Sequence, residues 1–287
     1  MKYLQYQIIK NCHRIFKNIN IKILSYLSIP IGLIYYILTF KNSIKLHNRS
    51  KILNKTLTIK YNPLSVKINY VKYWLETLWL TKDNFYNKIF KNVNIVNEEY
   101  IKNLKNEGII FALPHVGNWE MAIPVGKSIN LDLIAVAEPL SNHYVLNWFK
   151  NLREELGCKI IIGGKGQNTF NTLIKELNSG KHICLLSERS INKTGVGVEF
   201  FNNLASFPKG PVALALQTQL PIVPTTFLKI DNKYSLVFEK PFYVPLFDNE
   251  AISIQQGLKT LSKSFEKLIS LNPNEWHSIQ PVWSHEY

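Results

Sequence analysis

Acidic residues are missing from the first part of this sequence. No Asp or Glu precedes Glu76, whereas residues 1–75 contain 13 of the 34 lysines and arginines. Removing these 13 leaves 21 basic residues, which the 20 acidic residues of the remaining chain balance. The formal net charge of +14 therefore belongs to the N-terminal region, and it predicts contact with an anionic surface there.

Cysteine is also scarce, and its pattern excludes two kinds of site. Cys12, Cys158 and Cys184 are odd in number and do not have the spacing of metal ligands. They support neither a zinc site nor a disulfide framework. We expect no metal, and a reducing, cytoplasm-facing environment fits this pattern.

One apolar stretch lies inside the basic region. Residues 23 to 40 carry no charge and come close to the ~20 residues that a helix needs to span a bilayer, although Pro30 and Gly32 interrupt them. The preceding segment has the pattern of a basic amphipathic surface helix, with Leu4, Ile8, Ile9, Cys12, Ile15 and Phe16 opposite Lys2, Lys10, Arg14 and Lys17. We predict a membrane-associating segment over residues 1–45. A spanning anchor, an in-plane helix and an ordinary buried helix remain the alternatives, and a secretory signal is not expected because no cleavage site follows.

Nucleic acid is not an expected partner, in spite of the basic charge. The chain has no recognisable nucleic-acid-binding motif, and its basic residues surround an apolar run that a duplex-binding surface does not need. Anionic membrane lipids fit this arrangement better.

From about residue 107 the sequence alternates between short apolar runs and helical periods. Runs rich in Ile, Val and Leu predict buried strands at 108–114, 131–137, 158–162, 182–187 and 220–228. Helical periods fall at 144–156, 169–177, 211–217 and about 254–271, and the Gly-Lys-rich residues 163–166 predict a turn. The fold class is therefore α/β, with a largely parallel central sheet flanked by helices. We expect one domain over residues 46–287, including a helical approach segment to about residue 106.

His115 falls at the carboxyl end of the first of these strands, where open α/β sheets bind ligands. Gly117 and Asn118 suit a tight turn and a helix N-cap, which places Glu120 in the first turn of the next helix. Such a turn can fold the carboxylate back onto the imidazole, giving a base and the group that orients it. The alternative is a histidine that only makes a local backbone hydrogen bond.

Several ordered blocks resemble a known family. "LPHVGNWEMA" (113–122) resembles the His-then-four-residues-then-acid block of glycerolipid-type acyltransferases, and in particular the bacterial lipid A and phosphatidylinositol mannoside acyltransferase family. Further similar blocks follow in the order of the family: "AVAEPL" (135–140), "LREELGCKII" (152–161), "ICLLSERSINKTGVGVEFF" (183–201), "ASFPKGPVALALQTQLPIVP" (205–224) and "NEWHSIQPVW" (274–283). The Glu-Arg pair at 188 and 189 and the last block look most like the actinobacterial phosphatidylinositol mannoside acyltransferases. Ser190, Asn202 and Gln219 depart from the family pattern, which puts local loop shape in doubt.

The resemblance implies roles for the residues of these blocks. His115 would be the general base for a hydroxyl, and Glu120 would fix its tautomer and stabilise the imidazolium. Arg153 and Arg189 would contact phosphate or polar headgroups through their guanidinium groups, although a surface ion pair is the alternative for Arg153. Glu188 would bind acceptor hydroxyls or hold Arg189. The backbone amides around Lys209 and Gly210 are candidate oxyanion donors.

The resemblance also implies an activity and a location. We expect acyl transfer from acyl-CoA or an acyl carrier protein, without a cofactor, to a mannose hydroxyl of a phosphatidylinositol mannoside. The expected site of action is the cytoplasmic face of the bacterial inner membrane. Late acylation of a lipid A precursor is the nearest alternative, and a non-catalytic membrane-binding scaffold is an alternative of a different class.

Overall fold

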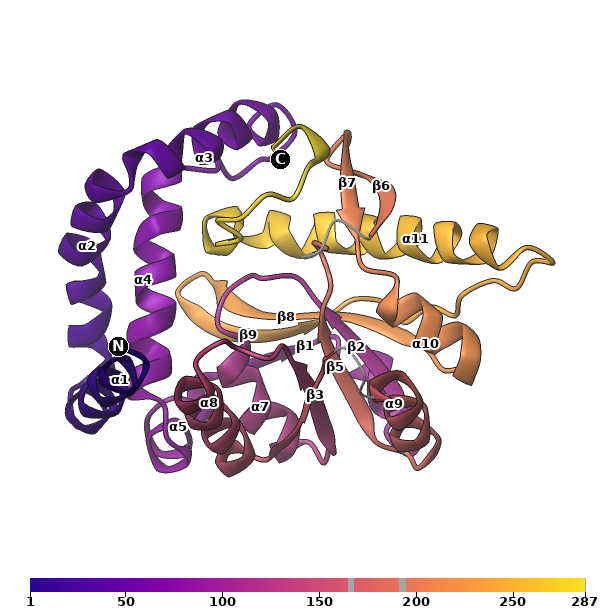
Figure 1. Ribbon diagram of the computed structural model, residues 1–287, viewed down its shortest axis with the longest axis horizontal. Coiled ribbons are helices and arrows are strands. Elements are labelled where there is room, and N and C mark those ends of the chain that lie inside the picture. The colour runs from indigo at the N-terminus through magenta and orange to yellow at the C-terminus, as the bar shows by residue number, and fades with distance from the viewer. Residues whose placement is uncertain (165–167, 191–194, 287) are drawn as a thin grey trace.

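The computed structural model describes residues 1–164, 168–190 and 195–286, and its centre is a seven-stranded sheet (Figure 1). The strand order is β1-β9-β8-β2-β5-β3-β4, and every neighbouring pair is parallel except β8 with β9. The strands are β1 Asn94–Val96, β2 Ile109–Leu113, β3 Leu133–Ala137, β4 Cys158–Ile162, β5 His182–Leu186, β8 Ile222–Ile230 and β9 Lys233–Phe238. The expected α/β class with a largely parallel sheet is confirmed.

Within the described residues all five expected strands are present, together with four strands that the sequence did not predict. β8 continues past residue 228 to Ile230 and turns through Asp231 and Asn232, both with positive φ, into β9. Positive φ at both positions is the requirement of the two-residue hairpin turns that match strand twist. β6 Val196–Phe200 and β7 Asn203–Phe207 form a separate antiparallel pair. The short β1 completes the edge of the main sheet.

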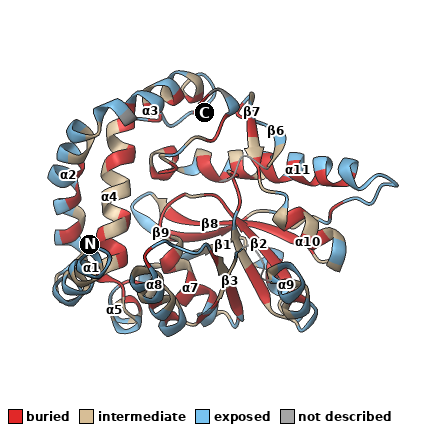
Figure 2. Cartoon of the chain, in the orientation of Figure 1, coloured by how far each residue is buried: buried red, intermediate tan, exposed pale blue. Residues whose placement is uncertain are grey.

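Helices cover both faces of the sheet, so the molecule has two apolar cores. The helices from residue 82 onward are α5 Lys82–Lys88, α6 Glu99–Lys102, α7 Trp119–Ser128, α8 His143–Leu156, α9 Thr169–Asn178, α10 Gly210–Thr218 and α11 Glu250–Leu271, with 3-10 turns at Phe90–Asn92, Pro273–Glu275 and Ser284–Glu286. One core joins α9, α10 and α11 to the sheet, and the other joins α5, α7 and α8 to the opposite face (Figure 2). Successive residues of β2 enter opposite cores, because side chains of a strand alternate between faces. Of the expected 163–166 turn, residues 165 and 166 lie outside the described residues.

The first four helices form a layer at one side of the sheet (Figure 1). They are α1 Lys2–Phe16, α2 Ile21–Leu38, α3 Phe40–Leu53 and α4 Pro63–Trp79. α2 lies along α4 and buries a stripe made of Leu24, Ser28 and Gly32. A Cβ atom added at Gly32 would lie 2.7 Å from Ile68 Cα, so glycine permits this close helix contact. By length and hydropathy α2 is also long and apolar enough to cross a membrane.

A buried ion pair ties this helical layer to the C-terminal segment. The Arg49 guanidinium donates to both carboxylate oxygens of Glu286, at 2.6 and 2.7 Å, and to the carbonyl oxygens of Ser278 and Gln280. It also lies over the rings of Trp276 and Trp283. Removing one partner of a buried ion pair leaves an uncompensated charge, which costs about 3–5 kcal/mol. This clasp fixes the path of residues 276–283, of which Trp276 forms a β-bridge with Val116, the residue after His115.

Candidate active site

His115 follows β2 by two residues, at the carboxyl end of the parallel strands. A sharp turn then reverses the chain into α7. Gly117 has φ +64°, its N–H donates to Glu275 O at 3.0 Å, and a Cβ atom here would lie 2.0 Å from Phe227 O. Only glycine fits a left-handed conformation this close to another backbone. Asn118 is the N-cap residue, as expected, but its side chain donates to Glu76 instead of capping the helix.

His115 is paired with Glu188. The Nδ1 atom of His115 lies 2.7 Å from both carboxylate oxygens of Glu188, whose side chain is fully buried, while the His115 side chain is 19% exposed. The carboxylate fixes the tautomer with the proton on Nδ1, which leaves Nε2 to accept a proton from a substrate. Burial opposes ionisation of Glu188, but the contact with His115 and backbone hydrogen bonds outweigh it, so the pKa of Glu188 lies below its ordinary value.

The expected contact between Glu120 and His115 was wrong. Glu120 is fully buried and accepts two hydrogen bonds from Arg153, from Nε at 2.9 Å and from Nη2 at 2.7 Å. Trp119 Nε1 donates to the same carboxylate at 3.1 Å. The first turn of α7 thus directs Glu120 toward α8, where a bidentate arginine offers its charge a stronger partner than an imidazole does. Arg153 is accordingly not in a surface ion pair but in a largely buried one.

The order of the strands explains why Glu188 is the partner. β5 lies beside β2 with Leu113 opposite Leu186, and the pairing continues with Ser187 N–H donating to Leu113 O at 2.9 Å. His115 lies two residues beyond the end of β2, Glu188 lies two residues beyond the end of β5, and their side chains meet there. They are 73 positions apart in the chain, and only the adjacency of β2 and β5 brings them together.

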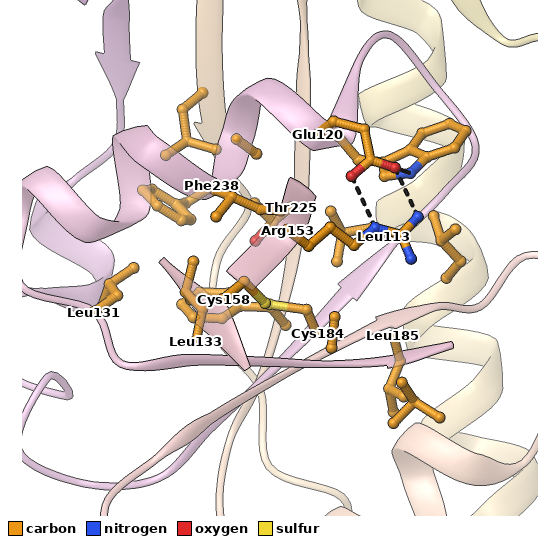
Figure 3. Close-up of a pocket in the computed structure, with 18 residues that line it drawn as sticks. Leu113, Glu120, Leu131, Leu133, Arg153, Cys158, Cys184, Leu185, Thr225 and Phe238 are labelled. Carbon is orange, nitrogen blue, oxygen red and sulfur yellow. Dashed lines mark hydrogen bonds and ion pairs between the residues drawn. The ribbon is translucent and has the colours of Figure 1, made fainter. Parts of the chain in front are cut away.

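An apolar pocket (Figure 3) is lined by Leu113 and Trp119, which lie on either side of His115 in the chain, and by Leu186, two residues before Glu188. Most of its lining comes from β2, β3, β5 and α7, including Phe111, Leu113, Ile123, Leu133, Ala135, Leu185 and Leu186. The Glu120–Arg153 ion pair is its charged part, as the dashed bonds of Figure 3 show. Cys158 and Cys184 also line it, and burial raises the pKa of the Cys158 thiol to about 12 and that of Cys184 well above its ordinary value, so both stay neutral.

The other expected substrate-binding residues lie outside this pocket lining. Arg189 Nη1 donates to Gln280 Oε1 at 3.3 Å, which links the residue after Glu188 to the C-terminal segment. Lys209 is the exposed N-cap of α10 and Gly210 is its first residue. The substrate-binding roles of Arg189, Lys209 and Gly210 stay predictions. Among the described residues no group of three His, Cys, Asp or Glu is placed to hold a metal ion.

Aromatic residues of α4 and α7 surround His115, together with His277, for which the block at 274–283 predicts a structural or acceptor-side role. The Trp119 ring meets the His115 ring edge to face, with centroids 5.4 Å apart, and lies 4.6 Å from the Tyr73 ring. His277 lies next to both, 5.5 Å from Trp119 and 5.2 Å from Tyr73. Trp119 and Tyr73 were not predicted to lie near His115, because α4 and α7 meet there only in the folded chain.

Fold and site together define a class: an α/β protein with a histidine–carboxylate pair at the strand ends and an apolar pocket beside it, an arrangement suited to an enzyme that acts on lipids. Comparison with known proteins gives the family. The sequence model described as bacterial lipid A biosynthesis acyltransferase matches residues 67–285, and the chain belongs to this family.

Two curated relatives show the extent of the similarity. A phosphatidylinositol mannoside acyltransferase of Mycolicibacterium smegmatis is 26% identical over 219 residues, which cover 75% of this chain and 70% of the relative. The protein of the same name from Mycobacterium tuberculosis is 30% identical over 178 residues, 61% of this chain. The matched part spans only 54% of the length of that relative. The expected family, with its likeness to phosphatidylinositol mannoside acyltransferases, is confirmed.

Proposed function

We propose that the chain transfers a fatty acyl group from an acyl thioester, acyl-CoA or acyl carrier protein, to a mannose hydroxyl of a phosphatidylinositol mannoside. The observation that carries this proposal is the His115–Glu188 pair beside an apolar pocket. The similarity to two phosphatidylinositol mannoside acyltransferases favours this acceptor over a lipid A precursor. Acyl transfer to a hydroxyl needs one base and a place for the chain, and the site offers both.

The reaction follows from the orientation of His115. Nε2 takes the hydroxyl proton as the acceptor oxygen attacks the thioester carbonyl carbon, and Glu188 stabilises the resulting imidazolium. The C–S bond then breaks, and the imidazolium returns the proton to the thiolate leaving group. No covalent acyl-enzyme forms, because the hydroxyl oxygen is itself the nucleophile. The backbone amides near Lys209 and Gly210 are proposed to stabilise the oxyanion.

Glu120 acts in this proposal through Arg153. The carboxylate holds the guanidinium by its Nε and Nη2 atoms, so Nη1 is the group that can face a donor. A guanidinium at the edge of an apolar pocket suits the polar part of an acyl thioester, whose hydrocarbon chain then enters the pocket. Arg189 is proposed to bind an anionic or polar headgroup on the other side of Glu188.

The N-terminal helices are proposed to hold the enzyme on the cytoplasmic face of the inner membrane. α1 and α2 expose Leu4, Ile8, Ile34, Ile37 and other large apolar side chains next to basic residues. Surfaces of this composition bind anionic bilayers through apolar burial and charge together. The acceptor, a lipid, is in the same leaflet.

The test is radiolabelled acyl transfer by the purified protein, with palmitoyl-CoA as donor and phosphatidylinositol mannosides or a lipid A precursor as acceptor. His115→Ala should lower the rate by roughly 10²–10⁴-fold, because general base catalysis contributes about this much. His143→Ala, at an exposed histidine at the start of α8, is the matched control and should keep the wild-type rate.

Each outcome decides between the alternatives. Label in mannosides that disappears in the His115 variant supports both base and acceptor. Label only in the lipid A precursor keeps the chemistry and replaces the acceptor. A wild-type protein that labels neither acceptor, while it still binds vesicles, overturns the proposed function in favour of a membrane-binding scaffold.

A further inference from the structure

Four charged side chains that take no part in the proposed reaction lie together beside the turn that follows His115. Lys72 and Glu76 come from α4, Lys229 from the end of β8, and Glu275 from the 3-10 turn after α11. The side chains of Glu76, Glu275 and Lys72 are only 3%, 8% and 15% exposed. Charged groups are costly to bury, so a protein retains them in its interior where they are paired.

The Lys72 ammonium is an ion-pair partner of both carboxylates. Its Nζ atom lies 3.6 Å from Glu275 Oε1 and 3.9 Å from Glu76 Oε1. Burial opposes the charge of Lys72, but the two carboxylates outweigh burial, so its pKa lies above the ordinary value. The Lys229 ammonium lies 4.3 Å from the centre of the Tyr234 ring, and burial together with the charge of Lys72 lowers its pKa to about 8. Lys72 therefore keeps its charge at any physiological pH.

Glu76 holds the turn through the side chain of Asn118. Its Oε2 atom accepts a hydrogen bond from Asn118 Nδ2 at 3.2 Å, and its Oε1 atom accepts one from the Tyr234 hydroxyl at 2.6 Å. An N-cap asparagine ordinarily bonds to the first turn of its own helix, but the Asn118 side chain makes no such bond in α7. The bond to α4 takes the place of the cap, so Glu76 fixes the turn relative to α4.

Glu275 holds the same turn through its backbone. Its carbonyl oxygen accepts a hydrogen bond from Gly117 N–H at 3.0 Å, and its carboxylate accepts one from Lys229 N–H at 3.0 Å. The carboxylate thus fixes the 3-10 turn to β8, and the carbonyl oxygen fixes the backbone two residues after His115. Consecutive residues of the turn are therefore held by two glutamates, and Lys72 contacts both glutamates.

We propose that Lys72 is a positioning residue for His115, acting through the two carboxylates that hold the turn after it. This inference rests on the proposed function, because it needs a reaction in which His115 is the base. Without Lys72, two buried carboxylates of like charge lie close together, and their repulsion moves the turn. A displacement of about 1 Å at a reacting group can cost about 10²-fold in rate. Within the described chain Lys72 does not line the apolar pocket, so substrate binding should change little.

The test measures kcat and both KM values of Lys72→Met in the acyl-transfer assay, with palmitoyl-CoA and a phosphatidylinositol mannoside. Methionine keeps an unbranched apolar stem and removes the charge. The value of kcat should fall roughly ten- to 100-fold, whereas the KM for donor and the KM for acceptor should each change less than threefold. Thermal unfolding followed by circular dichroism shows whether the variant is folded at the assay temperature.

A second substitution separates the effect of charge from that of packing. Lys72→Met combined with Glu275→Gln removes one cation and one carboxylate but keeps the backbone oxygen that holds the turn. The kcat of this double variant should be at least fivefold above that of Lys72→Met, because the two sites are coupled through charge.

Lys105→Met is the matched control. The Lys105 side chain is 22% exposed and pairs with Glu98 at 3.0 Å. It precedes β2, at the opposite end of that strand from His115. The same loss of an ion-paired lysine there should leave kcat at the wild-type value.

A kcat within threefold of wild type in folded Lys72→Met overturns this inference and leaves the proposed function in place, whether or not the unfolding temperature falls. A rise in either KM that exceeds the fall in kcat assigns Lys72 to substrate binding and also overturns it. So does a double variant that is no faster than Lys72→Met. If Lys72→Met does not fold, Asn118→Ala, which removes the side-chain contact with Glu76, decides by the same fall in kcat. Absence of any transfer by the wild type overturns the proposed function, and this inference with it.

Discussion

At the scale of single residues, the contact between His115 and Glu188 determines which nitrogen can take part in chemistry. Both carboxylate oxygens lie within 2.7 Å of Nδ1, and Glu188 has no exposed surface. Its lowered pKa means that the carboxylate is ionised at neutral pH in spite of its burial. A buried, ionised carboxylate orients the imidazole and stabilises its protonated form.

We therefore predict that Glu188→Gln lowers kcat by roughly 10²–10⁴-fold. The amide keeps the shape of the side chain, but it removes the charge that stabilises the imidazolium and can donate to Nδ1, which favours the wrong tautomer. Initial rates at saturating donor and acceptor give kcat. Glu199→Gln, at a carboxylate that is 63% exposed and pairs with Lys263, should keep the wild-type rate. A kcat within threefold of wild type for Glu188→Gln contradicts the assignment.

The sequence predicts half of this pair. His115 was recognised by its place after an apolar run and by the family-like block, and the structure places it at the expected edge of the sheet. Glu188 was not recognised as its partner, because it is close to His115 only in space, whereas Glu120 is close in the chain. Sequence periodicity predicts strands but not their order, and the β2–β5 adjacency is what decides the partner.

At the scale of elements, the turn between β2 and α7 is the most constrained part of the site. Gly117 combines φ +64° with a backbone contact that leaves no room for a Cβ atom. Sequence analysis predicted a tight turn here from the Gly-Asn pair, and the turn is present. It could not predict the contact with Phe227, because that residue comes from β8.

Gly117→Ala should lower the free energy of unfolding by about 2–4 kcal/mol, since it adds both backbone strain and a steric clash. Urea unfolding followed by tryptophan fluorescence measures this change. Gly210→Ala is the control: a Cβ atom there has no neighbour within 4 Å, so the free energy of unfolding should shift by less than about 1 kcal/mol. Equal stabilities of the two variants would show that the turn can relax.

At the scale of the whole molecule, the arrangement of α2 favours in-plane membrane binding over spanning. α2 buries its Leu24, Ser28 and Gly32 stripe along α4, and α4 carries the buried charges of Lys67 and Glu76. A helix attached along its length to such a partner cannot enter the bilayer alone, and charged side chains are expensive in hydrocarbon. The sequence left this choice open because length and hydropathy are the same for both modes.

We predict that the protein binds anionic vesicles, less strongly at high salt, and that alkaline carbonate releases it. The double variant Ile34→Glu, Ile37→Glu should weaken vesicle partitioning at least tenfold, because two charged side chains then replace apolar side chains on the face that enters the bilayer. Both positions are exposed, at 57% and 62%, so the fold should persist. Ile252→Glu makes the same kind of substitution at a 47% exposed residue of α11, and it should leave vesicle partitioning unchanged. Retention of the wild type after carbonate extraction would identify α2 as a spanning helix.

The clasp between Arg49 and Glu286 sets an order of events while the chain is being synthesised. The two residues are 237 positions apart, and at about 5–20 residues per second roughly 10–50 s separate their synthesis. During that time the helices proposed to bind lipid have left the ribosome, whereas residues 276–283 still lack the ion pair that fixes their path. The helices proposed to bind the membrane are therefore complete before Glu286 can pair with Arg49 and fix the C-terminal segment beside His115.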